Sequence, residues 1–242
     1  LGSSVETIGE SAFYDCNALE ELTIPDSVKT INSGAFAGIE SLKNVTIGSG
    51  CTSINTYAFS GDTALESITV SADNTTYASA DGALLNKNKT AILLYPKARS
   101  GAYKIPDTIT EIGESTFSDC KNLTEIVIGN GVTHIGDYTF SRCESLTTVT
   151  LGVNLETMGQ EVFWNCSSLK FITLPASLRE IGQYCFENCS SLVDVYAHPL
   201  VPPTIYDNTF PVAIAANATL HTTKGYKADY ENAIYWKSFG SI

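Results

Sequence analysis

Phenylalanine recurs along this chain at a fixed interval of 23 residues, and no other feature constrains the fold as strongly. The column consists of Phe13, Phe36 and Phe59 and then, after 35 additional residues, Phe117, Phe140, Phe163 and Phe186. A leucine stands six residues after each phenylalanine, and an isoleucine or methionine stands five residues before it. Several columns in one register indicate an internal repeat, which predicts a solenoid of stacked coils.

Two short strands are expected in each repeat. In the stretch LTEIVI, Ile126 and Ile128 alternate with Glu125 and Val127, and this alternation is typical of a strand with one buried face. The stretch GVTHIG is a second extended segment, bounded by glycines that indicate turns. A single unit has too few apolar side chains to offset the entropy of ordering its backbone, so neighbouring units must stack.

The repeat is interrupted once and fades at its end. The 35 extra residues lie between Val70 and Ile105, where GALLNKNKTAILLYP reads as strand, turn and strand. After Cys189 the spacing loosens, ATLHT resembles a last strand, and the final twenty or so residues predict a short helix and an apolar cap. We therefore expect one solenoid domain over residues 1–242, with repeats in 1–70, an enlarged coil with a β-hairpin in 71–105, repeats in 106–200, and a last coil and cap in 201–242.

The first residue already occupies a strand-end position of the repeat. Leu1 stands four residues before Val5, as Ile24 stands four residues before Val28. We therefore expect the chain to be a fragment whose first repeat strand is incomplete, and its beginning says nothing about a secretion signal.

Charge and composition argue against two classes of partner. The formal net charge of −12 argues against a nucleic-acid phosphate backbone as partner, because the two would repel each other. No apolar run approaches the roughly 20 residues that a membrane helix needs, so no membrane insertion is expected in this segment. The acidic residues are scattered, which favours a role in solubility.

Five of the seven cysteines share one column, three residues after the phenylalanine: Cys16, Cys120, Cys143, Cys166 and Cys189. Stacked coils would bring them to strand spacing, about 4.8 Å, at which a disulfide is an alternative. Ile39 fills the same position in another repeat, however, so the column predicts reduced thiols buried as small apolar groups. The chain has no C-x-x-C pair and its three histidines are dispersed, which predicts no metal site.

No motif for catalysis is present. The sequence lacks G-x-S-x-G, a phosphate-binding loop and H-E-x-x-H, and no cysteine has a plausibly placed histidine. The stretch DNTTYASADG does not fit the spacing of a twelve-residue calcium loop. We expect no catalytic residue, no cofactor and no enzymatic activity.

The repeat C-x-x-L-x-x-I-x-I-x-x-x-V-x-x-I-G-x-x-x-F-x-x-C resembles the bacterial BspA-like leucine-rich repeat, also called the Treponema pallidum type. The inserted NTTYASADGALLNKNKTAILLYPK and the closing ATLHTTKGYKADYENAIYWKSF resemble recurrent features of that family, whereas Ile39 and Asp62 depart from its cysteine position. The resemblance implies a mainly β, curved right-handed coil with a parallel concave sheet. It also implies a secreted or surface-attached protein of a host-associated bacterium, several such proteins being similar to adhesins.

Two hypotheses for function remain open. The first is a monomeric extracellular or cell-surface module that binds a host or bacterial surface protein or glycan through its concave sheet. The outward strand positions are mostly threonine and other polar residues, but Phe171 and Tyr196 are aromatic. With His198, Thr173 and Asp194 on the same two strands, they form the predicted patch. In the alternative for these rings, the C-terminal cap covers them. The second hypothesis is a passive stalk or spacer of a larger surface protein.

Overall fold

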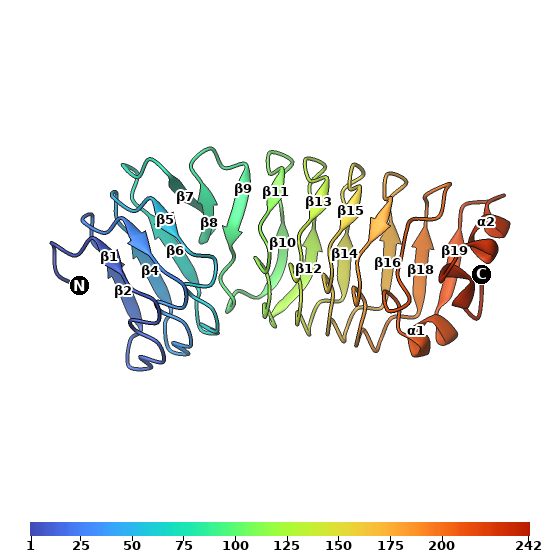
Figure 1. Cartoon of the computed structure of the whole chain (residues 1–242), viewed down its shortest axis with the longest axis horizontal. Coiled ribbons are helices and arrows are strands. Elements are labelled where there is room, and N and C mark those ends of the chain that lie inside the picture. The colour runs from blue at the N-terminus through green and yellow to red at the C-terminus, as the bar shows by residue number, and fades with distance from the viewer. The chain divides into compact units, whose positions relative to one another are not determined.

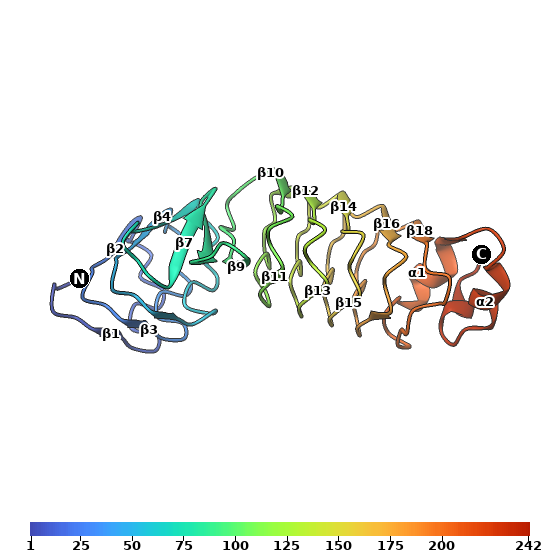
Figure 2. The same ribbon diagram turned by 90° about the horizontal axis from the view of Figure 1, so that it is seen from above.

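The computed structural model describes residues 1–242 as two compact units, residues 1–99 and residues 100–242. Each unit is a mainly β solenoid in which most coils contribute a longer strand to one side and a two-residue strand to the other (Figures 1 and 2). The predicted fold class is therefore confirmed. The single-domain organisation expected over the whole chain stays a prediction.

In the first unit, parallel strands stack one repeat apart. The long strands are β2 (Glu21–Ile24), β4 (Asn44–Ile47) and β6 (Ser67–Val70), and the short strands are β1 (Thr7–Ile8), β3 (Thr30–Ile31) and β5 (Ser53–Ile54). Along the long strands every second residue is buried, beginning with Leu22 and Ile24 in β2. This alternation follows from the two-residue period of a strand with one face on the core.

The inserted residues fold as antiparallel strands, β7 (Tyr77–Ala80), β8 (Ala83–Asn86) and β9 (Ala91–Leu94). The predicted hairpin is confirmed as β8 and β9. Its turn is held by Asn86, whose side-chain oxygen accepts hydrogen bonds from the N–H groups of Thr90 and Ala91 at 2.9 and 3.0 Å. Strand β7 was not predicted, because the alanines and the serine that follow Tyr77 in YASA carry little strand signal.

The second unit repeats the same arrangement. Its long strands are β10 (Gly101–Lys104), β12 (Leu123–Val127), β14 (Thr148–Thr150), β16 (Phe171–Leu174), β18 (Asp194–Ala197) and β19 (Thr219–Thr222), and its short strands are β11 (Glu111–Ile112), β13 (His134–Ile135), β15 (Thr157–Met158) and β17 (Glu180–Ile181). From β12 to β14 and from β16 to β18 the register is again one repeat, with Phe171 beside Asp194, whereas β18 and β19 pair with an offset of 25 residues. Side chains of one sequence column therefore lie in one row across the sheet.

The core of each unit is built around stacked phenylalanine rings. In the second unit the ring centroids of Phe117, Phe140, Phe163 and Phe186 follow one another at 5.1, 5.5 and 5.7 Å, and none of these side chains is exposed. The predicted burial of this column is confirmed. In the first unit Phe36 and Phe59 are buried as well, and Phe13, in the first coil, is half-buried.

All seven cysteine thiols are free. Three of the buried thiols connect neighbouring coils, because the sulfurs of Cys143, Cys166 and Cys189 lie 3.2, 3.2 and 3.1 Å from the carbonyl oxygens of Phe117, Phe140 and Phe163. Burial raises the pKa of these thiols, so they remain protonated donors at neutral pH. The expectation of burial is wrong for Cys16, which is exposed in the first coil.

The C-terminal segment ends the column of aromatic rings. It contains α1 (Val212–Asn217), α2 (Lys227–Asn232) and the 3-10 helix η1 (Trp236–Ser238). Trp236 lies 5.6 Å from Phe210 between ring centroids, and its indole N–H donates to the Pro203 carbonyl at 2.7 Å. Tyr230 is buried beside it and donates to the Pro199 carbonyl at 2.9 Å. No helix has the length and apolar character needed to cross a membrane.

Candidate functional site

The residues of the predicted patch lie on two adjacent long strands, β16 and β18, with His198 directly after β18, and β19 pairs with β18 on its other side. Ile172, Leu174, Val195 and Ala197 are buried in these strands, so the alternate residues Phe171, Thr173, Asp194 and Tyr196 point outward. The register forms two outward rows. One row runs from Phe171 through Asp194 to Thr219, and the other runs from Thr173 through Tyr196 to His221.

One half of the patch is a bonded cluster that includes a residue the sequence analysis did not select. His221 stacks on Tyr196 with 4.4 Å between ring centroids and 11° between ring planes. Its Nε2 lies 2.7 Å from Oδ1 of Asp194, which fixes the imidazole against the sheet. These three side chains thus form one preorganised group of two rings and a carboxylate, of which Tyr196 remains 36% exposed.

The other half of the patch is a groove with a volume of about 590 Å³. Phe171, Thr173 and His198 line it, together with Thr148, Thr150 and Pro175 from neighbouring strands and turns. Phe171 is 40% exposed, and His198 is exposed at the end of β18. The lining is mostly apolar atoms and hydroxyl groups, and it contains no carboxylate or ammonium group.

The structure therefore groups the five predicted residues in two neighbouring sets. Phe171, Thr173 and His198 line the groove, whereas Asp194 and Tyr196 belong to the cluster with His221. Phe171 and Tyr196 are diagonal neighbours in the register, since Phe171 pairs with Asp194 and Tyr196 pairs with Thr173. The ring that stacks on Tyr196 is that of His221.

The cap does not cover these rings. Its large side chains Tyr230, Trp236 and Phe239 are buried and extend the aromatic column of the core through Phe210. Phe171 and Tyr196 stay exposed. The alternative in which both rings complete the packing of the cap is therefore wrong.

A second hollow, of about 410 Å³, lies over the short strands of the second unit. Its polar groups already bind one another: the His134 ring nitrogen Nδ1 lies 2.5 Å from the Thr157 hydroxyl, and the Tyr206 hydroxyl donates to Glu180 at 2.9 Å. The hydrogen bond to Glu180 raises the pKa of Tyr206. Because these groups are satisfied within the chain, this hollow is a weaker candidate than the groove beside Phe171.

Nothing in the patch forms an acid–base couple or a metal centre. The one close pair of titratable side chains in the patch, Asp194 with His221, has no nucleophilic side chain bonded to it. No group of three or more His, Cys, Asp or Glu side chains is placed to hold a metal ion. The arrangement suits recognition. It offers exposed rings, hydroxyl groups and a shallow depression on a rigid sheet.

Solved structures of bacterial leucine-rich repeat proteins are similar to this chain. The pneumococcal vaccine antigen PcpA aligns with a TM-score of 0.74 at 21% identity, over 93% of this chain and 67% of that one. A leucine-rich cell surface protein from Faecalibacterium prausnitzii aligns with a TM-score of 0.72 at 24% identity, over 96% and 65% of the two chains. A leucine-rich repeat protein from Eubacterium ventriosum aligns with a TM-score of 0.67 at 25% identity, over 92% and 71%.

This chain spans about two thirds of the length of those three proteins. No curated protein matches it. The model of the BspA type leucine-rich repeat region matches six copies of the repeat, over residues 1–88 and 97–211. Those copies cover most of the chain and coincide with the stacked coils, so the protein belongs to the BspA-type leucine-rich repeat family.

Proposed function

We propose that this protein is a binding module of a bacterial surface or secreted protein and that its partner docks on the predicted patch of β16 and β18. The partner is a protein or glycan of a host or neighbouring cell, and the module acts as a monomer without catalysis. The fold is that of bacterial leucine-rich repeat surface proteins, which suggests protein binding or a structural role. The observation that carries the finer proposal is the exposure of Phe171 and Tyr196 beside a groove.

Exposed aromatic rings on a rigid sheet need a reason. Leaving a large apolar side chain in water forgoes about 1.5–3 kcal/mol of burial, and rings of this kind dominate the energetics of many interfaces. Phe171 pairs with Asp194 on one side, and Thr148, one repeat earlier in the sequence, lines the same groove on the other, so neither offers it a partner ring. Phe171 is 40% exposed, so a partner that covers it would recover part of this free energy.

The side chains of Tyr196, His221 and Asp194 are held in fixed positions beside the groove. Stacking and the 2.7 Å contact hold both rings in one conformation before any partner arrives. Preorganised side chains bind with a smaller loss of entropy. The Tyr196 hydroxyl and the free nitrogen of His221 add polar contacts at the edge of an apolar surface, an arrangement typical of interfaces.

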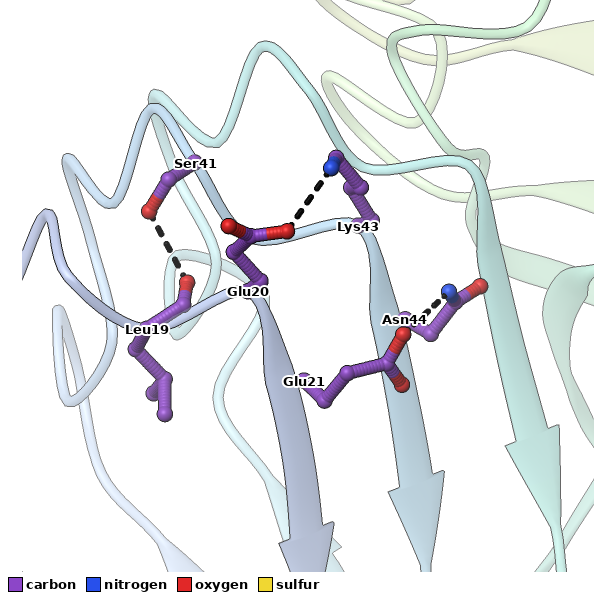
Figure 3. A network of polar contacts seen from close by, with 6 residues as sticks. All are labelled: Leu19, Glu20, Glu21, Ser41, Lys43 and Asn44. Atoms are coloured by element: carbon purple, nitrogen blue, oxygen red, sulfur yellow. Dashed lines mark hydrogen bonds and ion pairs between the residues drawn. The ribbon is translucent and has the colours of Figure 1, made fainter.

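The corresponding face of the first unit differs in this respect. The side chains of its outward row, Glu21, Asn44 and Ser67, form hydrogen bonds with one another. The Asn44 amide donates to Glu21 at 2.9 Å, and the Ser67 hydroxyl donates to Asn44 at 2.8 Å. Figure 3 shows the first of these contacts together with the ion pair between Glu20 and Lys43. We therefore place the binding surface on the second unit.

A passive spacer is the second candidate, because a repeat array can hold other domains apart with no ligand of its own. The two candidates differ in what the isolated chain binds. A spacer binds nothing above background, whereas a binding module retains a partner on its patch.

The experiment compares the wild type with the double variant Phe171→Ser, Tyr196→Ser on immobilised fibronectin, fibrinogen, laminin and collagen and on a glycan array. We expect the wild type to bind at least one probe and the double variant to lose that binding at an unchanged melting temperature. The control is Tyr14→Ser, Tyr57→Ser, which removes two exposed rings from the first unit and should bind as the wild type does.

Each result is decisive. Absence of binding by the wild type to every probe would favour the spacer. Loss of binding by the control variant would place the surface elsewhere on the chain. A large fall in the melting temperature of the Phe171→Ser, Tyr196→Ser variant would assign both rings to packing of the solenoid.

A further inference from the structure

Asp62 is a buried carboxyl group in the column that elsewhere holds cysteine. It follows Phe59 by three residues, as Cys143 follows Phe140, and its side chain has no exposure to solvent. Its Oδ1 accepts the N–H of Ile39 at 2.8 Å, but its Oδ2 is buried and has no hydrogen-bond partner. A buried carboxylate oxygen without a donor is costly, so the protonation state of this group requires an explanation.

The cysteines of the second unit show what the column position does. Each of three thiols contacts the carbonyl of the phenylalanine 26 residues earlier, as the Cys143 sulfur does with Phe117 at 3.2 Å. For position 62 the equivalent acceptor is the carbonyl of Phe36. In the second unit the phenylalanine carbonyl also accepts the N–H of the residue three positions later, as the Phe117 carbonyl does from Cys120. In the first unit the equivalent N–H, that of Ile39, donates to Asp62 instead.

The repeat therefore places the carbonyl oxygen of Phe36, an acceptor, next to position 62. The side chain at position 62 must then be the donor, as the thiols are in the second unit. An ionised carboxylate has only acceptor atoms, so it leaves both the Phe36 carbonyl and its own Oδ2 without a donor. A protonated carboxyl group has one O–H and supplies what the thiol supplies in the second unit.

We infer that Asp62 is protonated in the folded protein at mildly acidic pH and donates its Oδ2–H to the Phe36 carbonyl, which makes residues 1–99 a pH-sensitive unit whose stability falls as pH rises to neutrality. Asp62 thereby replaces the thiol that connects coils in the second unit. The exchange turns a pH-independent connection into one that depends on a single proton.

The surroundings of Asp62 support this assignment. Burial raises its pKa from 3.8 to about 7, and the N–H groups of Ile39 and Gly38 and the charge of Lys97 offset only part of that rise. Lys97, which follows β9, is the one charged side chain whose charge lowers the pKa of Asp62. The preceding coil presents the backbone N–H groups of Gly38 and Ile39 to it.

The direction of the effect follows from linkage. The folded state holds the proton up to about pH 7, and the unfolded chain releases it near 3.8. The contribution to stability is therefore complete below the unfolded value, declines between the two values and is lost above about pH 7. Full linkage of one proton changes the unfolding equilibrium constant by about tenfold per pH unit in that interval.

The test uses hydrogen exchange of the Ile39 amide in the full chain, between pH 5 and pH 7, after correction for the intrinsic exchange rate. We expect protection in the wild type to fall by about tenfold per pH unit relative to Asp62→Asn, which keeps the acceptor for Ile39 and supplies a donor that does not titrate. Asp62→Cys, which restores the column thiol, should behave as Asp62→Asn does. Asp73→Asn, an exposed carboxylate of the same unit, should retain the wild-type slope.

The carboxyl carbon of Asp62 gives an independent readout in ¹³C spectra of the wild type, and it decides the question if the variants fail to fold. A midpoint above pH 6 supports the inference. A midpoint below pH 5, or an Asp62→Asn variant with the same pH dependence as the wild type, overturns it.

Discussion

The two units share one repeat but differ in the residue that stands three positions after its phenylalanine. In residues 100–242 the third residue after the phenylalanine is cysteine in four coils. Three of these thiols contact the phenylalanine carbonyl of the preceding coil. In residues 1–99 the same position holds the exposed Cys16, Ile39, whose side chain has no donor, and Asp62, whose carboxyl group donates only when protonated. The phenylalanine stack is present in both units and stays buried in each, whichever residue fills this position.

The outward rows differ more than the inward columns. In the first unit Glu21, Asn44 and Ser67 are hydrogen-bonded to one another along their row, whereas the rows of the second unit contain the exposed ring of Phe171 and the ring of Tyr196 stacked on His221. Stacking requires particular side chains inside each coil but not on its outer face. A binding surface can therefore arise on one unit while the other remains plain.

The largest expected effect comes from the inward column that the units share. Phe140→Ala removes a fully buried ring between Phe117 and Phe163, so we expect a loss of about 3–5 kcal/mol from the transfer free energy and the cavity. Urea unfolding followed by tryptophan fluorescence measures it, because both tryptophans, Trp164 and Trp236, lie in the second unit.

The exposed Val153→Ala is the control in the same unit and should change stability by less than about 0.5 kcal/mol. Phe36→Ala extends the test to the first unit through hydrogen exchange of the Val45 amide. A cost near zero for Phe36→Ala would mean that the units do not share the same packing.

An intermediate effect is expected from the cysteine column. Cys166→Ala removes a buried sulfur and its contact with the Phe140 carbonyl, so we expect a loss of about 1–2 kcal/mol in the same fluorescence measurement. Thr147→Ala removes an exposed bond between coils, to the Thr124 carbonyl at 3.0 Å, and should cost less than about 0.5 kcal/mol. Equal costs for the two variants would show that the buried thiol has no special part in joining coils.

The sequence predicted what repeats and missed what depends on position. The phenylalanine column, the alternating strands and the hairpin all follow from local patterns, and each was found. Cys16 was expected to be buried like the rest of its column. Its exposure is set by its place in the first coil, which no local pattern records.

The patch shows the same limit. Phe171 and Tyr196 were identified as outward residues by counting along strands, and they are outward and exposed. His221 was missed because it follows Tyr196 by 25 residues, outside the 23-residue register, although ATLHT had been read as a strand. The pairing of that strand with β18 signals the contact, and it becomes visible only in the register of the sheet.

The smallest effect is expected on the outward row of the first unit. Asn44→Ala breaks the bonds to Glu21 and Ser67, but all three groups lie near water, which replaces the lost partners. We expect a loss of less than about 1 kcal/mol, measured by hydrogen exchange of the buried Val45 amide beside it. Thr46→Ala, the next outward residue of β4, is the control and should cost about as little. If Asn44→Ala instead destabilised the first unit as much as Phe36→Ala, the outward row would be part of the structural framework, and the freedom of that face to acquire a binding function would be refuted.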